Sequence, residues 1–327
     1  MDMNRIFRLI ATASATLIAL ILLATAAHAE WPESTIKWIV PFSAGGANDI
    51  IARAAAKGVS ERLKRPIIIE NKPGAGAVIG TQYVAKSKPD GYTFLIGAAG
   101  VVTNSFLYRE PGYADSDLVP VGMIAVAPSV IVVNPSVPAS NLKEFVAWAK
   151  LQGDKNVNWA TAGSGSTPHF VAEMLKESGI NNLTIVPYKS GGESVAAVLG
   201  NNVSATSEAS IVVLPQIKAG KLKAIATTYE KRISSYPSIP TAIEQGFPSV
   251  NIGHWAGLFA PAGTPPAILE RMNAELRAVV ESTQFQDVMV PNGVEPVLYT
   301  LSEFVSFIAR ERQRLGRLAK NAHMTAE

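Results

Sequence analysis

Short runs of β-forming residues alternate with longer helical stretches along this chain, and that alternation constrains the fold more than any other feature. The predicted strands are Ile36–Val40, Ile67–Glu70, Thr93–Ile96, Val130–Val133, Asn158–Ala160, Thr184–Val186 and Leu222–Ala226. The predicted helices are Asp49–Leu63, Leu142–Leu151, Pro168–Glu177, Glu193–Leu199, Pro265–Glu281 and Leu301–Ala319. Strands that alternate with helices are typical of parallel sheets covered by helices. We therefore expect an α/β protein.

The N-terminal residues have the pattern of an export signal. Arg5 and Arg8 are followed by the apolar run Leu9–Ala26 and then by the small-x-small sequence Ala27–Ala29. We expect residues 1–29 to be a cleavable signal peptide and the mature protein to be periplasmic. The apolar run is also near the lower length limit of a membrane-spanning helix, so a retained anchor is the alternative.

The composition excludes several kinds of partner and site. The chain has no Cys, which removes disulfides, thiolate metal ligands and Cys nucleophiles together. Its formal net charge of +3 is too small to indicate nucleic acid or anionic lipid as the partner. Because hydrophobic residues make up 48% of the chain, a core can hold it together without disulfides.

The usual motifs of enzymes are missing. Gly163–Thr167 breaks the register of a G-x-S-x-G nucleophile elbow, and Gly74–Gly80 has one residue too many for a dinucleotide-binding fingerprint. Ser140–Lys143 matches S-x-x-K but lacks both companion motifs. No two histidines of the predicted mature chain have metal-ligand spacing: His169, His254 and His323. We predict no catalytic activity, no cofactor and no metal.

Two segments far apart in the sequence share one pattern. Ile39–Gly46 and Ile185–Gly192 both read I-V-P-aromatic-x-x-G-G, and each follows a predicted strand and opens a predicted helix. Chance is the alternative explanation for a single match of this length. If the match reflects structure, each half of the protein contributes a glycine-rich loop and a helix N-terminus to a shared cleft.

Such loops favour the binding of an anion. The first N–H groups of a helix have no intrahelical partner, and the aligned peptide dipoles place partial positive charge there. Glycines let the loop backbone approach a ligand closely. Gly163–His169, rich in Gly and hydroxyl residues, and Gly97–Asn104 are two more small-residue loops at strand ends. Ordinary strand-to-helix turns are the alternative for any one loop, whereas the four together predict a carboxylate or phosphate site.

A series of short motifs resembles the substrate-binding receptors of tripartite tricarboxylate transporters, the Bug-type receptors. The matching segments cover nearly all of the predicted mature chain in order: Trp31–Pro32, Ile39–Gly46, Asp49–Arg53, Glu70–Gly76, Pro89–Tyr92, Val186–Lys189, Ile217–Lys221 and Gly257–Pro265. Each segment alone is weak, and their combination is specific. One departure is Val203–Ser210, where many relatives carry an aromatic and an acidic residue, so the substrate of any one relative does not transfer to this chain.

The resemblance implies a type II periplasmic binding protein with two Rossmann-like α/β lobes, crossing hinge strands and a ligand cleft between the lobes. It places lobe 1 at residues 30–128 and 253–327, and lobe 2 at residues 129–252. It also implies a monomeric solute receptor that closes by a hinge around a small carboxylate and serves inner-membrane transporter subunits. A periplasmic hydrolase and a binding protein that partners a sensor are the alternatives.

The candidate ligand-binding residues come from the loops and from the departing segment. They are Phe42, Ser43, Ala44, Gly45, Gly46, Asp49, Ala98, Ala99, Gly163, Ser164, Ser166, Thr167, His169, Tyr188, Lys189, Ser207 and Glu208. By the resemblance, Ser43–Gly46 and Gly163–His169 hold the ligand carboxylate through main-chain N–H groups, hydroxyls and waters.

Several of these candidates have an alternative structural role. Asp49 precedes Arg53 by four residues in the first turn of a predicted helix, which favours a dipole-matched ion pair over ligand contact. Lys189 is either a charge partner for a distal carboxylate or a solvated surface lysine. Glu208 disfavours a second anion nearby unless it is protonated or paired.

Overall fold

The first half of the sheet is built from the predicted strands near the start of the chain. The computed structural model describes residues 31–153 and 155–325, so the predicted signal peptide lies outside the described residues. Strand β1 (Ile36–Val40) pairs in parallel with β2 (Ile67–Asn71) and β3 (Thr93–Gly97). The helices that follow these strands are α2 (Ala47–Leu63), α3 (Val78–Ala85, after the 3-10 turn Ala75–Ala77) and α4 (Ala99–Leu107).

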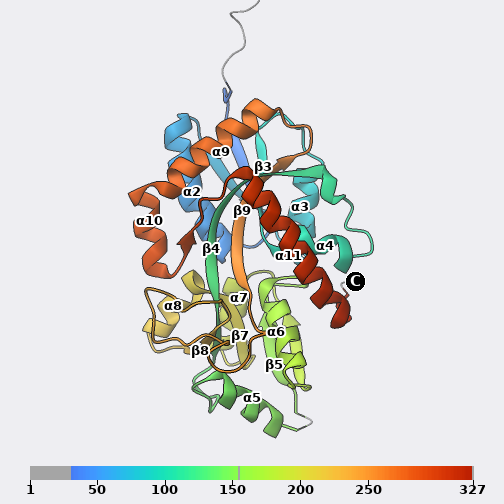
Figure 1. Cartoon of the computed structure of the whole chain (residues 1–327), viewed down its shortest axis with the longest axis vertical. Coiled ribbons are helices and arrows are strands. Elements are labelled where there is room, and N and C mark those ends of the chain that lie inside the picture. Colours follow the sequence, from blue (N-terminus) through green and yellow to red (C-terminus); the bar gives the residue numbers. More distant parts are fainter. Residues whose placement is uncertain (1–30, 154, 326–327) are drawn as a thin grey trace, which may run out of the picture. The chain divides into compact units, whose positions relative to one another are not determined.

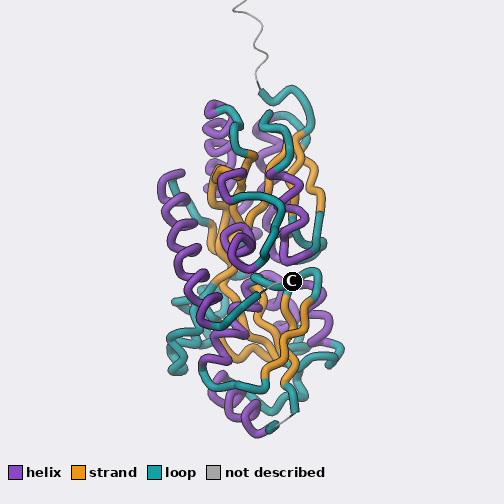
Figure 2. Tube along the Cα trace, turned by 90° about the vertical axis from the view of Figure 1, so that its right-hand side faces the viewer, coloured by secondary structure: helices purple, strands orange, loops and turns teal. Residues whose placement is uncertain are grey.

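The second half repeats this parallel arrangement. Strand β5 (Val157–Thr161) pairs in parallel with β6 (Leu183–Pro187) and with β7 (Ala205–Ala209). The accompanying helices are α5 (Leu142–Leu151), α6 (Thr167–Glu177), α7 (Gly191–Leu199) and α8 (Ser210–Lys218). Figure 2 shows strands in both halves with helices flanking them.

Two long antiparallel strands connect the halves. Strand β4 (Leu118–Val133) pairs with β9 (Gly253–Pro261) as far as Pro128, and from Ser129 onward it pairs with β7 and with β8 (Lys223–Thr227). Figure 1 shows β4 and β9 running between the two halves. The change of partner falls at the predicted lobe boundary between residues 128 and 129, and the boundary itself stays a prediction. The expected α/β class with two lobes and crossing strands is confirmed, although the sheet is mixed rather than all parallel.

The C-terminal helices cover the first half. They are α9 (Pro266–Glu281), α10 (Thr283–Met289) and α11 (Leu301–Asn321), with the 3-10 turn Val290–Asn292 and the short strand β10 (Glu295–Pro296) between the last two. Thr300 caps α11 by accepting from the Glu303 N–H while the Glu303 carboxylate accepts from the Thr300 N–H. In the described parts of the chain, no helix is both long and apolar enough to span a membrane.

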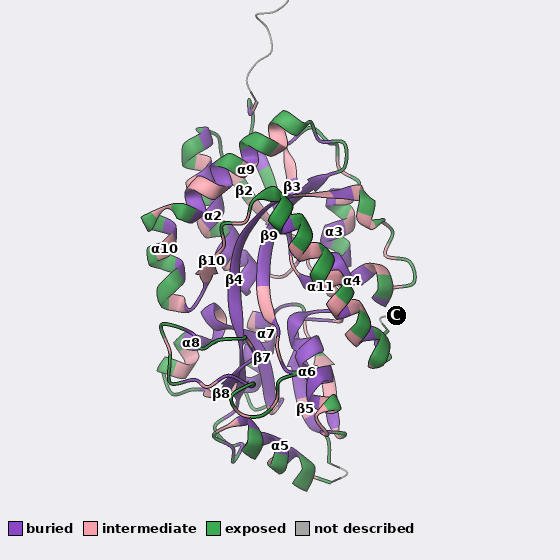
Figure 3. Ribbon diagram, viewed as in Figure 1, coloured by how far each residue is buried: buried purple, intermediate pink, exposed green. Residues whose placement is uncertain are grey.

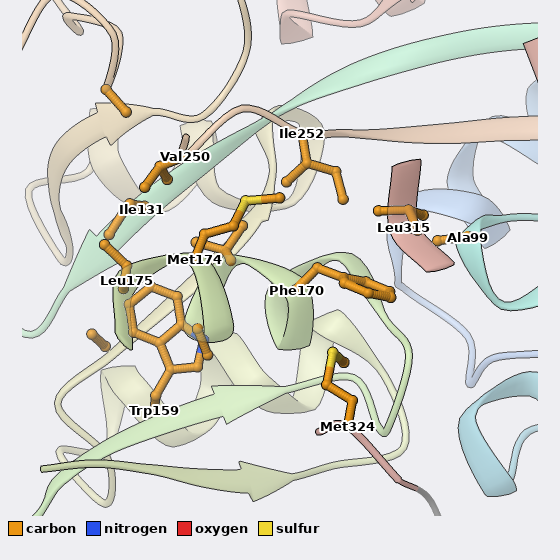
Figure 4. Packing of buried hydrophobic residues seen from close by; sticks show 14 of the residues in the cluster. Ala99, Ile131, Trp159, Phe170, Met174, Leu175, Val250, Ile252, Leu315 and Met324 are labelled. Atoms are coloured by element: carbon orange, nitrogen blue, oxygen red, sulfur yellow. The ribbon is translucent and has the colours of Figure 1, made fainter. Parts of the chain in front are cut away.

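The core continues from one half into the other. Strands β4 and β9 are buried along most of their length, whereas α9 and α11 expose their outer faces (Figure 3). One hydrophobic cluster joins Ala99 of α4, Phe170 of α6 and Leu315 of α11 (Figure 4). In the same cluster, the Trp159 indole N–H donates to the Pro168 carbonyl at 3.0 Å, so this large buried ring keeps its hydrogen bond. This packing fixes α6, whose N-terminus belongs to the candidate site.

Candidate functional site

The two loops that share one sequence pattern face each other in the structure. A Cβ built on Gly46 would lie 3.9 Å from the Ser190 Cβ and 4.0 Å from the Gly191 nitrogen. A Cβ built on Gly192 would lie 3.6 Å from the Gly45 carbonyl oxygen. The backbone of Gly45 is left-handed, with φ +84°, while Gly46 has φ −80° and ordinary extended geometry. Of this first glycine pair, only Gly45 therefore needs glycine for its backbone angle.

A small cavity of about 40 Å³ lies where these loops meet. The residues that line it are Phe42, Gly46, Ala47, Asn48, Ala98, Ala99, Gly100, Ala162, Ser166, Thr167, Pro168, Gly191, Glu208 and His254. We call it the inner cavity. The first turns of α2, α4, α6 and α7 all contribute to its wall, so four helix N-termini from both halves converge on one space.

Three of these four N-termini have no side-chain cap. Among the described residues, the side chains of the N-cap residues of α2, α4 and α6 accept no hydrogen bond from the N–H groups of the first turn. In α7, by contrast, the Ser190 hydroxyl caps the helix by accepting from the Glu193 N–H. N–H groups in a first helical turn have no intrahelical acceptor. Together with the helix dipoles, they make the inner cavity favourable for negative charge.

A larger hollow of about 420 Å³ adjoins the inner cavity and shares Phe42 and Ala162 with it. Its other lining residues are Pro41, Gly74, Ala75, Gly76, Ala77, Tyr108, Gly163, Ser164, Pro187, Tyr188, Lys189 and Glu193. Lys189 is exposed on this outer hollow, and its own N–H donates to the Glu193 carboxylate at 3.2 Å. Among the described residues that line the two spaces, Lys189 is therefore the single Lys or Arg, and it lies at the outer one.

Asp49 fixes the first glycine loop through hydrogen bonds. Its Oδ2 accepts from the Gly45 N–H and from Arg53 Nε, both at 3.0 Å, and its Oδ1 accepts from Asn71 Nδ2 at 2.9 Å. Burial tends to raise the pKa of Asp49, but the hydrogen bonds from Arg53, Gly45 and Asn71 outweigh burial and lower it. Asp49 lines neither space, which agrees with the structural role that the sequence favoured.

We expect Asp49→Asn to loosen this loop. Losing charge-assisted hydrogen bonds should lower the free energy of unfolding by about 1 to 3 kcal/mol at pH 7. The lowered pKa of Asp49 means that its ionised form stabilises the fold above the ordinary pKa of an aspartate, and that this contribution is lost in acid. The difference in stability between the unmodified protein and Asp49→Asn should therefore shrink as the pH falls below about 4. Urea unfolding at several pH values measures it. Asp287→Asn, the same change at an exposed α10 position, should have little effect. Equal stability of the two variants at pH 7 would contradict this role for Asp49.

The loop before α6 is also held by its own side chains. Ser166 donates from Oγ to the Gly163 carbonyl at 2.6 Å, and the Gly165 N–H donates to His169 Nδ1 at 3.0 Å. Burial, followed by the nearby Lys176 charge, lowers the pKa of His169 to about 4, so this imidazole is neutral at pH 7. His169 lines neither space and instead fixes the loop that presents Ser166 and Thr167.

Of the seventeen candidate residues, eleven line one of the two spaces and six line neither. The inner cavity takes Phe42, Gly46, Ala98, Ala99, Ser166, Thr167 and Glu208, and the outer hollow takes Gly163, Ser164, Tyr188 and Lys189. Six candidates line neither space: Ser43, Ala44, Gly45, Asp49, His169 and Ser207. Ser207 is next to Glu208 on β7, and neighbouring strand residues point to opposite faces. The expected loop Gly97–Asn104 is mostly helix, because α4 begins at Ala99.

Sequence reasoning missed several lining residues. His254 lies on the crossing strand β9, and Asn48 donates from Nδ2 to the Trp255 carbonyl at 3.3 Å. His254 lies beside the predicted lobe boundary between residues 252 and 253, and this position was the available signal. Gly74–Ala77 and Tyr108 line the outer hollow without being candidates, although Gly74–Gly76 belongs to a motif that carried the resemblance.

The buried Glu208 and the partly buried His254 lie together at the inner cavity. Glu208 is 2% exposed, and its Oε2 lies 4.0 Å from His254 Nε2. Burial raises the pKa of Glu208 to about 8, against an opposing hydrogen bond from the Ala209 N–H, and burial lowers the pKa of His254 to about 3. At these pKa values both side chains are uncharged at pH 7. The physical reason is that a neutral pair costs less free energy to bury than an ion pair.

Comparisons with known proteins agree with this geometry. A family model described as "Tripartite tricarboxylate transporter family receptor" matches residues 51–324. The protein BugT of Bordetella pertussis is 33% identical over 287 residues, covering 87% of this chain and 88% of that protein. The solved periplasmic binding protein BugD is 32% identical, with a TM-score of 0.86 over 91% of this chain and all of that chain. The R. palustris protein Rpa4515, solved with adipate, is 30% identical, with a TM-score of 0.87 over 90% of this chain and 99% of that chain.

Proposed function

Because this chain belongs to the tripartite tricarboxylate transporter receptor family, we propose that it binds a small carboxylate in the inner cavity and presents it to the membrane subunits of such a transporter. The observation that carries the proposal is the convergence of three uncapped helix N-termini on one cavity. Main-chain N–H groups of α2, α4 and α6, together with the hydroxyl of Thr167, are the donors, since the Ser166 hydroxyl already donates to the Gly163 carbonyl.

The lining chemistry favours a carboxylate over a phosphate. Phosphate recognition commonly recruits Arg, whose planar guanidinium donates two parallel hydrogen bonds. The inner cavity is lined by no Lys or Arg, and N–H groups with helix dipoles suffice for a single negative charge. The adipate in the related Rpa4515 structure supports a carboxylate ligand here.

The proposed receptor is a periplasmic monomer that closes by a hinge. The lobes are residues 30–128 with 253–327, and residues 129–252, so the bending points lie on β4 near Pro128 and on β9 near Gly253. Closure brings the loops after β2 and β5 into contact, and the narrow inner cavity is the closed state of the cleft. Hinge closure of two rigid lobes is a known way to enclose a ligand.

Isothermal titration calorimetry tests the proposed function. The protein is titrated with mono-, di- and tricarboxylates, amino acids, inorganic phosphate and a neutral sugar. We expect one or a few carboxylates to bind and phosphate and sugar to give no heat. Recovering the ligand unchanged after incubation separates a receptor from a hydrolase. Tight binding of the sugar, with no response to any acid, would overturn the proposal.

A further inference from the structure

The inner cavity contains a buried acid that the proposed anion site does not require. Within the described part of the chain, Glu208 Oε1 and His254 Nε2 have no hydrogen-bond partner. Both residues line the cavity, and these two atoms expose almost no surface, so only a group that enters the cavity could become their partner. Leaving buried polar atoms unpaired costs free energy unless something else satisfies them. A ligand group that bonds to them would remove this cost.

The second glycine loop makes room for the acid. A Cβ on Gly191 would lie 2.3 Å from Glu208 Oε2 and 2.6 Å from its Cδ, which is closer than atoms can approach. Gly191 therefore permits the Glu208 carboxyl to lie directly beside the first turn of α7. The repeated glycine pattern thus serves different purposes in the two loops, since a Cβ on Gly46 would meet only ordinary contacts.

Among the residues that the structure describes, the elements around Glu208 place no cation beside it that would hold it ionised. Strands β4 and β5, which flank β7, have no ionisable side chain, and β9 contributes only neutral His254 nearby. On the adjoining helices, the ionisable side chains have other partners or are exposed: His169 accepts from the Gly165 N–H, Glu173 pairs with Lys176, Glu193 accepts from the Lys189 main-chain N–H, and Glu177 and Lys218 are exposed. Asp49 of α2 is paired with Arg53. With the pKa of Glu208 raised to about 8, the acid form dominates at pH 7.

We propose that Glu208 donates a hydrogen bond from its protonated carboxyl to an oxygen acceptor on the ligand, with His254 Nε2 as a second contact. The inference rests on the proposed function and names the substrate class: a carboxylate with a second oxygen acceptor, such as a hydroxyl or keto group, close to the first. The small volume of the cavity requires the two groups to be near each other. An ammonium group in place of the oxygen would find a neutral acid and no carboxylate to pair with.

This subsite makes ligand capture dependent on pH. The donor is present while Glu208 is protonated and is lost as the pH rises through its pKa of about 8. Ionised Glu208 would also repel the bound carboxylate. Affinity for a hydroxy acid should therefore fall about tenfold between pH 7 and pH 9.

The test uses pairs of acids that differ in one substituent: lactate with alanine, malate with aspartate, and 2-hydroxyglutarate with glutamate. Calorimetry between pH 6 and pH 9 compares the unmodified protein with Glu208→Gln, Glu208→Ala and, as the control, exposed Glu177→Gln. We expect the hydroxy member of the binding pair to be preferred at least tenfold. Glu208→Gln keeps a donor, so it should bind within about threefold and lose the pH dependence, whereas Glu208→Ala should bind about 10- to 100-fold more weakly.

Other outcomes distinguish this inference from the proposed function. Preference for the amino member, with binding abolished by Glu208→Gln, means that an ionised Glu208 pairs with an ammonium group and overturns this inference alone. An affinity that does not change from pH 6 to pH 9 also overturns it. Binding of no carboxylate by any variant overturns the proposed function and this inference together. A ligand-independent check is the infrared carbonyl stretch of a protonated carboxylic acid at pH 7. It must be present in the unmodified protein and missing in Glu208→Gln.

Discussion

Replacing Gly76 by alanine should lower ligand affinity at least tenfold, about 1.4 kcal/mol, while leaving each half of the protein folded. A Cβ at this position would lie 2.2 Å from the Ser164 carbonyl oxygen and 2.6 Å from the Tyr108 hydroxyl. Gly76 follows β2 and Ser164 follows β5, so the backbone clash joins the two halves of the sheet. The clash with Ser164 disappears when the proposed lobes move apart, whereas the Tyr108 hydroxyl, which lies in the same proposed lobe, must shift in either state. The variant should therefore remain open.

The matched control for this substitution is Gly220→Ala. Both glycines have left-handed backbones, with φ +56° at Gly76 and φ +68° at Gly220, so alanine costs similar backbone strain at each. A Cβ at Gly220 would have no atom within 4 Å, and this glycine lines neither cavity. Small-angle scattering should show compaction on ligand addition for Gly220→Ala and none for Gly76→Ala. Equal affinity and equal compaction in both variants would refute closure through this contact.

The sequence predicted regular elements well where strand and helix patterns are strong. Predicted Ile36–Val40 and Leu142–Leu151 have the same bounds in the structure. Strand β4 was predicted only as Val130–Val133, because Pro120, Gly122 and Pro128 resemble strand breakers. The sheet tolerates two of them where its register shifts, between Pro120 and Gly122. Pattern alone contains no information on such irregular pairing.

Strand β7 shows why part of the site was harder to predict. Its sequence Ala205–Ala209 is small and polar, and Thr206 is its single β-branched residue, yet it lies between β4 and β5 and all five residues are buried. The glycine loops could be found because they are contiguous in sequence. The Glu208–His254 pair depends on a contact between strands 46 positions apart in the chain, which only the fold brings together.

Glu208→Gln should make the ligand-free protein more stable at neutral and alkaline pH. The folded chain holds a proton on Glu208 up to a pKa of about 8, while the unfolded chain releases it near the ordinary pKa of 4.5. Between these values the folded state binds more protons than the unfolded state, so the stability of the unmodified protein falls as the pH rises. Gln has nearly the same shape and does not ionise. The difference in unfolding free energy should therefore grow from about 1 kcal/mol at pH 5 to about 3 to 5 kcal/mol at pH 8 and then level off.

Urea unfolding of both proteins between pH 5 and pH 9 measures this difference, with Glu177→Gln as the control for removing an exposed carboxylate. A gain that is confined to Glu208→Gln and rises across this range indicates that the buried acid is retained at a cost to stability, which is expected of a residue kept for binding. Stability curves that run parallel from pH 5 to pH 9 would show that Glu208 ionises normally. In that case the acid cannot serve as the hydrogen-bond donor of the inner cavity, and an ionised Glu208 facing a cationic ligand group becomes the better explanation.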